Sequence, residues 1–145
     1  MLDLGLGSRC ILSNTSSFSA QSSFISLSQR ILCISFFTCN ISRSPRRLLT
    51  LALKAIGVEP GDEVIVPSHT YIATWLAISH CGAIPVPVEP QKPTGNINAS
   101  LIAERISEKT KAIIPVHLYG CPVDLDPILN IAREHKLAVI EDAAQ

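Results

Sequence analysis

The chain has 145 residues, with twelve basic and twelve acidic side chains and a formal net charge of zero. This balance gives no electrostatic basis for binding nucleic acid or an anionic membrane, so we expect neither as a partner. Five scattered cysteines form no Cys-x-x-Cys pair, which argues against a disulfide framework or a metal site. Reduced thiols in a cytoplasmic protein are the simplest interpretation.

Residues 1–45 differ in composition from the rest of the chain. They contain twelve serines and three cysteines, but no lysine, no glutamate and a single acidic residue, Asp3. Eleven of the twelve acidic residues lie after Leu48. Such a shift predicts a boundary, so we divide the chain into a serine-rich segment, 1–45, and a partial α/β domain, 46–145.

Three interpretations of the serine-rich segment stay open. An organellar transit peptide is rich in serine, contains arginine and lacks acids, as this segment does. A poorly ordered natural extension would also fit, because the segment has weak periodicity and would bury little surface. We favour a segment that is foreign to the domain, as after a shifted reading frame or a wrongly chosen start. Its apolar run at 31–41 is too short to span a bilayer.

From residue 46 onward, helix-like and strand-like runs alternate. Apolar residues at helical spacing predict helices at 48–56, 70–81, 98–106 and from 126 onward. Short β-branched runs predict strands at 63–67, 84–88, 111–118 and 137–141. Asn98 and Asp126 are the predicted N-caps of the last two helices, with Pro127 at the first helical position, and Gly82 is predicted to end the second helix.

Four apolar strands separated by helices predict a mostly parallel sheet with helices on both faces. Pro85 and Pro87 lie two apart, so both missing N–H donors face one side of their strand, which predicts an edge or an irregular pairing. Ligands of such sheets bind beyond the carboxyl ends of the strands. Asp142 and Gln145 follow the fourth strand, so we expect them at that rim.

The positions of the candidate side chains leave several roles open. Asp142 could bind a metal, accept a phosphoryl group, hold a ribose, pair with a protonated ring nitrogen or cap a following helix. Tyr71 could be a core or rim tyrosine, and Trp75, one turn later, is expected to pack. His69 and His80 lie eleven residues apart with no third ligand in view, so we expect no metal site.

Three collinear stretches resemble one family. They are 57–74, which contains Pro-Gly-Asp-Glu-Val-Ile-Val-Pro-Ser-His-Thr-Tyr, then 110–120, Thr-Lys-Ala-Ile-Ile-Pro-Val-His-Leu-Tyr-Gly, and 139–145, Val-Ile-Glu-Asp-Ala-Ala-Gln. In this order and spacing they resemble the DegT/DnrJ/StrS family of PLP-dependent sugar aminotransferases. The resemblance covers about residues 49–145. It implies the N-terminal part of the large domain of a fold type I PLP-dependent transferase.

The resemblance implies roles for individual residues. Asp142 would pair with the pyridinium nitrogen of pyridoxal 5'-phosphate (PLP), Gln145 would hydrogen-bond the phenolic oxygen of the ring, and Tyr71 would stack on the ring. His117 and Tyr119 lie in a family motif at another strand end and are candidates for the substrate side. A structural histidine is an equally good interpretation of His117.

The resemblance also implies an enzyme of amino-sugar and polysaccharide biosynthesis. It would work as a homodimer and move an amino group, from glutamate, to a keto group of a nucleotide-linked deoxysugar. In the family, the lysine that forms the Schiff base with PLP lies beyond the aspartate motif, and none of the five lysines of this chain has that context.

A Ser/Asn-Gly-Thr turn that holds the cofactor phosphate in the family is replaced here by Ser44-Pro45-Arg46. Proline has no N–H donor and cannot adopt the glycine conformation. We therefore expect a fragment with no catalytic residue of its own and no activity alone. The alternatives are a non-enzymatic α/β ligand-binding module and a truncated product without function.

Overall fold

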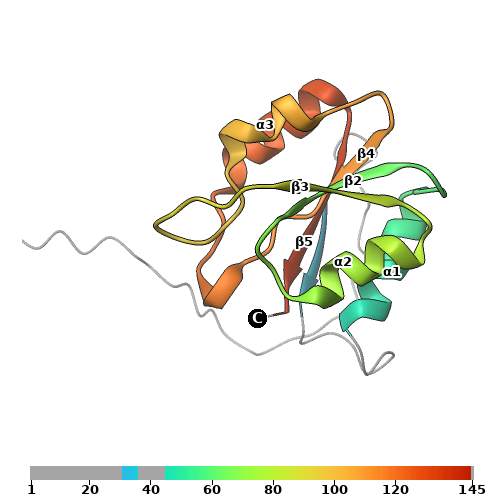
Figure 1. Cartoon of the computed structure of the whole chain (residues 1–145), viewed down its shortest axis with the longest axis horizontal. Helices are drawn as coiled ribbons and strands as arrows, with labels where there is room; N and C mark the ends of the chain where they lie inside the picture. Colours follow the sequence, from blue (N-terminus) through green and yellow to red (C-terminus); the bar gives the residue numbers. More distant parts are fainter. Residues whose placement is uncertain (1–30, 36–44, 145) are drawn as a thin grey trace, which may run out of the picture.

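A five-stranded parallel sheet lies at the centre of the computed structural model, which describes residues 31–35 and 45–144. The strand order is β1-β5-β4-β2-β3 (Figure 1). The strands are β1 (Ile31–Ser35), β2 (Glu63–Pro67), β3 (Ile84–Val88), β4 (Thr110–Ile113) and β5 (Ala138–Ala143). The prediction of a mostly parallel α/β sheet is confirmed, and β2 and β3 have the predicted bounds.

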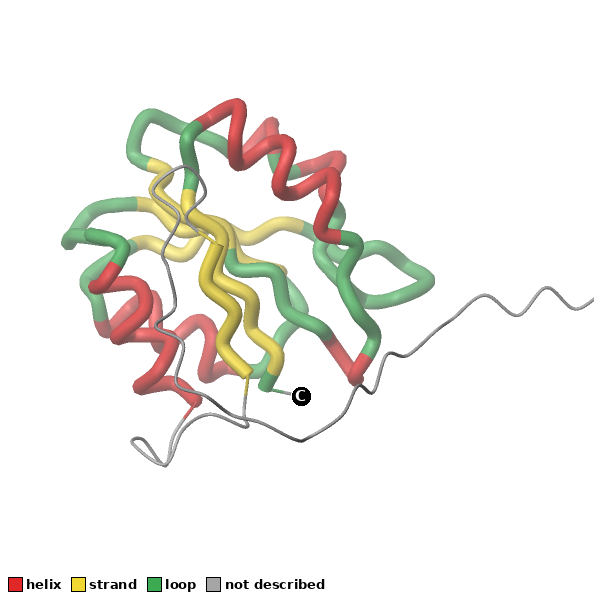
Figure 2. Tube along the Cα trace, turned by 180° about the vertical axis from the view of Figure 1, so that it is seen from behind, coloured by secondary structure: helices red, strands yellow, loops and turns green. Residues whose placement is uncertain are grey.

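Helices cover both faces of this sheet. The α-helices are α1 (Pro45–Ala55), α2 (Ile72–His80) and α3 (Leu125–His135), and the 3-10 turns are η2 (Ala99–Leu101), η3 (Ala103–Arg105) and η4 (Leu118–Gly120). Helices α1 and α2 lie together on one face and α3 lies on the other (Figures 1 and 2). Helices on both faces, as expected from the sequence, are therefore present.

The alternation of side chains along the strands builds two separate apolar cores. Val64 and Val66 of β2 and Ile140 of β5 pack with α1 and α2. Ile65 and Val139, one residue away on the same strands, pack with α3 and η2 on the opposite face. Because both faces are buried, residues 64–67 of β2 and 138–140 of β5 are continuous apolar runs instead of a polar–apolar alternation.

Strand β3 forms one edge of the sheet, as its two prolines predict. The Ile84 N–H donates to the Asp62 carbonyl, and the Val88 carbonyl accepts from the Ser68 N–H, so the even-numbered residues of β3 face β2. Pro85 and Pro87 alternate with them and face the outer side. The two prolines thus lack their N–H groups on the side of β3 where no described strand pairs with it. The sheet therefore loses no hydrogen bond at these positions.

Helix α1 begins at Pro45, three residues before its predicted start, and two other predicted helices differ more from the observed structure. The region after Asn98 forms two short 3-10 turns, although Asn98 is the cap, with its side chain accepting from the Ser100 N–H. Ile106 is already extended and leads into β4, which begins four residues later. The stretch between Asn98 and Ile106 is therefore less than two turns of an α-helix long. Helix α3 begins at Leu125 with Asp124 as N-cap, two residues before the prediction. Pro127 fits there, since N–H groups of the first turn have no helical partner.

Strands β4 and β5 also differ from the predicted ranges. Regular pairing of β4 ends at Ile113, and only an isolated bridge joins Val116 to Asp142 beyond Pro115, which has no N–H. Strand β5 continues to Ala143, so Asp142 lies inside the last strand and not after it. This position fixes the backbone of Asp142 by two hydrogen bonds, from its N–H to the Pro115 carbonyl and from the His117 N–H to its carbonyl.

Part of the serine-rich segment lies in the sheet. Strand β1 pairs in parallel with β5, in the register Ile31↔Val139 to Ser35↔Ala143. The segment that the sequence analysis sets outside the α/β domain thus contributes a strand to the sheet, and the three interpretations of its origin stay untested. The pairing is favoured because β5 would otherwise end the sheet with an unpaired edge, and 31–35 is a β-branched apolar run that can satisfy it. Residues 1–30 and 36–44 lie outside the described residues, so the boundary at residue 46 stays a prediction.

No helix among the described residues has both the length and the apolar character that crossing a membrane requires.

Candidate functional site

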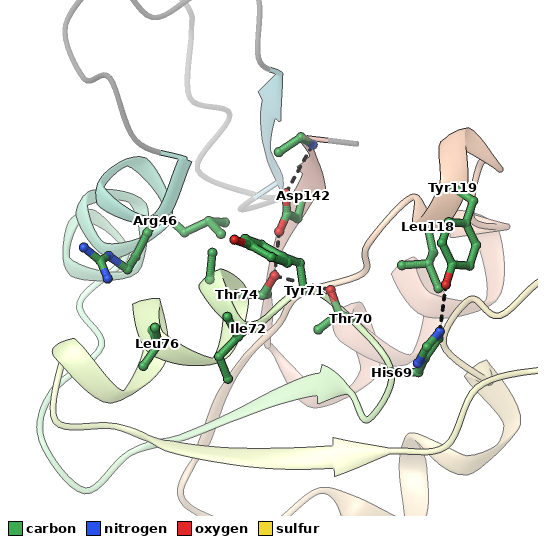
Figure 3. Close-up of a pocket in the computed structure, with 13 residues that line it drawn as sticks. Arg46, His69, Thr70, Tyr71, Ile72, Thr74, Leu76, Leu118, Tyr119 and Asp142 are labelled. Atoms are coloured by element: carbon green, nitrogen blue, oxygen red, sulfur yellow. Dashed lines mark hydrogen bonds between the residues drawn. The ribbon is translucent and has the colours of Figure 1, made fainter.

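A cavity of about 790 Å³ opens at the carboxyl ends of the strands, between the starts of α1 and α2 and the η4 turn (Figure 3). Its lining includes Arg46, His69, Tyr71, Thr74, Tyr119 and Asp142. Parallel sheets place ligands at this rim because consecutive strand ends and the helix starts that follow them converge there. Three of the five residues proposed from the sequence therefore line one cavity.

Asp142 is the buried acid of this cavity, with 5% of its surface exposed. Its side chain follows Ile140 on the α1–α2 face of β5, because residues two apart on a strand share a face. Oδ2 accepts from the Thr74 hydroxyl at 2.9 Å, and Oδ1 accepts from the Ala144 N–H at 3.2 Å. The one contact between a basic and an acidic side chain among the described residues joins His117 to Glu141, so Asp142 has no cationic partner there.

This arrangement limits what the Asp142 carboxylate can do. A buried charge needs hydrogen-bond or ionic partners, and each oxygen of Asp142 has one donor from the protein. A carboxylate oxygen can accept a further hydrogen bond, so acceptor capacity remains toward the cavity. A cationic N–H donor of a ligand is the group that such a buried, unpaired carboxylate would bind most strongly.

Thr74 is a site residue that the sequence analysis missed. It lies on α2 with 2% of its surface exposed, at the head of the buried stripe that continues through Ala77 and Ile78. Its hydroxyl is also 3.4 Å from the Thr70 hydroxyl. Since the single hydroxyl proton of Thr74 goes to Asp142, Thr70 is the donor in that second contact. The sequence did contain a signal for Thr74, because a polar residue at the start of an apolar helical stripe indicates a buried polar contact.

Tyr71 immediately precedes α2 as its N-cap residue and is 69% exposed. A tyrosine this exposed is not part of the core, so of the roles left open only the rim position and the ligand-facing position fit. Its ring lies in the space that Asp142 faces (Figure 3). Trp75 packs against the α1–α2 core and donates from Nε1 to the Pro67 carbonyl at 3.2 Å, which confirms its packing role.

His117 lies outside the cavity lining. Its Nδ1 accepts from the Val123 N–H at 3.0 Å, so the ring proton is on Nε2, which lies 3.4 Å from Glu141 Oε2. Both ring nitrogens have protein partners, and the ring holds the 117–123 loop against β5. This geometry fits the structural role that the sequence left open.

Tyr119 lines the cavity from the opposite side to α2 and is 78% exposed. Its backbone is left-handed, with φ at 54°, inside the η4 turn. The phenolic oxygen lies 3.3 Å from His69 Nε2, and the two ring centroids are 6.2 Å apart. His69 thus pairs with Tyr119 and not with His80, and the described residues contain no group of three metal-ligating side chains.

Two predicted parts of the site are not described. Gln145, expected to contact the phenolic oxygen of a cofactor ring, lies outside the described residues, as does Ser44. Pro45 is the first residue of α1. Arg46 follows it and lines the cavity, with its guanidinium directed away from Asp142 (Figure 3).

Residues 44–145 match the sequence profile of the DegT/DnrJ/EryC1/StrS aminotransferase family. Over 97 residues the chain is 57% identical to the erythromycin biosynthesis sensory transduction protein EryC1 of Saccharopolyspora erythraea. It is 54% identical, also over 97 residues, to a dTDP-3-amino-3,4,6-trideoxy-alpha-D-glucose transaminase of Streptomyces venezuelae. Each alignment covers 67% of this chain and 26% of the relative, so the chain spans about a quarter of the length of these relatives.

Solved structures with similar sequences also have a similar fold over this region. The crystal structure of S. venezuelae DesV superposes with a TM-score of 0.69 at 52% identity, over 70% of this chain and 28% of DesV. The structure of Bacillus subtilis NtdA with bound cofactor PMP superposes with a TM-score of 0.68 at 42% identity, over 69% of this chain and 23% of NtdA.

Proposed function

The chain belongs to the DegT/DnrJ/EryC1/StrS aminotransferase family, and from this premise we propose that residues 46–145 form part of the cofactor-binding domain of a sugar aminotransferase. The proposed reaction moves an amino group from glutamate to a keto group of a nucleotide-linked deoxysugar. The name of the S. venezuelae relative, a transaminase of a dTDP-linked trideoxy sugar, supports this substrate class. The single observation that carries the proposal is the buried Asp142 carboxylate, facing a cavity beside an exposed aromatic ring.

The side chains of the cavity fit the ring of pyridoxal phosphate. When bound, this cofactor supplies an electron sink at its pyridinium ring. Asp142 would accept the ring N–H, and a carboxylate serves this purpose because its charge keeps that proton in place. Tyr71 would cover a face of the ring, and Gln145 is proposed as the donor to the phenolic oxygen.

The phosphate end of the proposed site is less complete. The start of α1 lies at the cavity, and a helix N-terminus favours an anion through its free N–H groups. Pro45 contributes no N–H at this turn. We therefore propose that this chain holds the ring portion of the cofactor better than the phosphate portion.

On the substrate side, we propose Tyr119, with His69 beside it, as the pair that faces the sugar. Both can donate and accept hydrogen bonds, which suits the hydroxyl groups of a sugar. His117 remains in the proposal only as the residue that holds the Tyr119 loop. The intact enzyme is proposed to be a cytoplasmic homodimer, in keeping with the family resemblance and with the free thiols of Cys81 and Cys121 among the described residues.

Binding of pyridoxamine 5'-phosphate (PMP) to the whole chain tests the proposal. This amine form of the cofactor binds without a covalent bond to lysine, so its affinity measures the cavity alone. We expect saturable quenching of PMP fluorescence by the wild-type chain. Asp142→Asn should weaken the affinity about tenfold or more, because it removes the charge that pairs with the ring N–H.

Asp126→Asn is the matched control, since this exposed aspartate lies on α3, away from the cavity. It should leave the affinity for PMP unchanged. A folded wild-type chain that binds no PMP, or equal weakening by both variants, would count against the proposed function.

A further inference from the structure

The strongest unassigned feature of the cavity is the hydrogen bond from Thr74 to Asp142. We propose that Thr74 is a positioning residue of the cofactor site, which sets the orientation of the Asp142 carboxylate toward the ring nitrogen. This inference rests on the proposed function. It assigns a role to Thr74, an uncharged residue of α2. Only the folding of the chain brings Thr74 next to Asp142, 68 residues away in the sequence.

The geometry gives the Asp142 carboxylate two donors from two different elements. Oδ1 is held by the Ala144 N–H at the end of β5, and Oδ2 by the Thr74 hydroxyl from α2. The last torsion of an aspartate side chain has broad minima, so one donor alone leaves the carboxylate plane free to turn. The second donor fixes that plane. The lone pairs of Asp142 that accept no hydrogen bond from the protein then point in a fixed direction within the cavity.

Thr74 is well suited to be a fixed donor. Only 2% of its surface is exposed, and as a β-branched side chain in a helix it has few allowed rotamers. The Thr70 hydroxyl, at 3.4 Å, supplies a donor to the Thr74 oxygen, so the Thr74 proton stays directed to Asp142.

The same helical turn carries Tyr71. The Thr74 N–H donates to the Tyr71 carbonyl at 3.1 Å, so the two residues move together at the start of α2. Tyr71 would lie against the face of the cofactor ring while Thr74 holds the acceptor of its nitrogen. A single turn of α2 therefore fixes both the plane of the ring and the direction of its N–H bond.

A purely structural role for Thr74 makes a different prediction. A hydroxyl that only satisfies a buried carboxylate contributes to stability, and its loss lowers the free energy of unfolding without acting on the ligand. The distinguishing measurements are the affinity for PMP and the state of the Asp142 carboxylate itself, compared at matched loss of stability.

The test uses the whole chain with Thr74→Val, which removes the hydroxyl at nearly constant shape, and Thr74→Ser, which retains it. Thr74→Ala is a second hydroxyl-free variant that keeps the test possible if the valine variant does not fold. The control is Thr110→Val. Thr110 is 5% exposed, accepts from the Ser107 N–H at 2.9 Å, and begins β4 at the opposite end of the sheet.

Two quantities are measured for each folded variant, the dissociation constant of PMP and the ¹³Cγ chemical shift of Asp142 without ligand. We expect the hydroxyl-free variants at Thr74 to bind PMP about tenfold more weakly and to shift the Asp142 signal. Thr74→Ser should lie close to the wild type in both measurements. Thr110→Val should lose stability but change neither quantity.

The outcomes separate the inference from the proposed function. If the wild type binds PMP and the hydroxyl-free variants bind it equally well, the inference is overturned and the proposed function stands. An unchanged Asp142 signal in those variants also overturns the inference. If the folded wild type binds no PMP, the proposed function falls, and the cofactor role of Thr74 falls with it.

Discussion

The side-chain amide of Asn96 is bound to the backbone of the loop that carries Tyr119. Asn96 Oδ1 accepts from the Leu118 N–H at 3.0 Å, and Nδ2 donates to the carbonyls of Cys121 and Pro122 at 3.0 and 3.3 Å. Asn96 is 4% exposed, so these bonds are shielded from water. The left-handed backbone of Tyr119 is therefore held from both sides by one buried amide.

Asn96→Ala should destabilise the domain and loosen this loop. The substitution removes the amide from three backbone groups at a cost of about 1–3 kcal/mol, although the Leu118 N–H keeps the Val116 carbonyl as a second acceptor. Urea unfolding measures that cost, and limited proteolysis within residues 118–122 measures the loosening of the loop. Asn130→Ala, at an exposed position of α3, should change neither. Equal stability of the two variants would show that the amide does not hold the loop.

Tyr71→Ala should weaken binding of PMP by about three- to tenfold, the range expected for one aromatic contact. Tyr71→Phe retains the ring and should bind as the wild type does. The comparison isolates stacking from the phenolic hydroxyl, and fluorescence titration of the whole chain gives both affinities. Since Tyr71 is 69% exposed, neither substitution should lower the free energy of unfolding by more than about 0.5 kcal/mol. Weaker binding by the phenylalanine variant would contradict the stacking role.

Truncation to alanine should lower the stability strongly at one leucine of α1 and hardly at all at another. Leu53 is fully buried in the core between α1, α2 and the sheet, whereas Leu51, two residues earlier, is 57% exposed. Leu53→Ala should cost about 2–5 kcal/mol, from lost burial and the cavity left behind. Leu51→Ala should stay within about 0.5 kcal/mol of the wild type. Urea denaturation followed by circular dichroism measures both, and similar values would disprove the packing of α1.

Cys81 should make the stability of the domain sensitive to alkaline pH. Burial raises the pKa of the Cys81 thiol, and the nearby Lys54 ammonium offsets part of this rise. Folding thus favours the neutral thiol. Its contribution to stability is present below the ordinary thiol pKa and is lost as the pH rises through the raised value.

The measurement is the free energy of unfolding between about pH 8 and about pH 10, which brackets the ordinary thiol pKa. The wild type should lose more stability over this interval than Cys81→Ala, which has no thiol to titrate. The slope with pH, and not the absolute stability, carries the test, because the alanine variant also loses packing. Parallel slopes would rule out a role for the thiol.

The sequence by itself determined the class of fold and most of the strands. The runs at 63–67 and 84–88 have the predicted bounds, because a short β-branched apolar run between turn residues is a pattern that is local in the sequence. The prolines of β3 marked the edge, since a missing donor is tolerated only on an unpaired side. Asp142 was placed at the strand ends by its position after an apolar run.

Element boundaries depended on longer-range effects. The start of α3 at Leu125 and the end of β4 at Ile113 depend on which backbone N–H and carbonyl groups find hydrogen-bond partners in the folded chain. The pairing of β1 with β5 joins segments more than 100 residues apart in the chain, and no local pattern specifies it.

The composition of the site was decided by tertiary structure. Thr74 and Asp142 are 68 residues apart in the sequence, and His69 and Tyr119 are 50 apart. Each pair meets because α2 lies on the face of the sheet that carries Asp142, and because the η4 turn folds back over the same strand ends. Local patterns predict which segments are buried, but the partner of a buried polar group is fixed only when distant elements pack together.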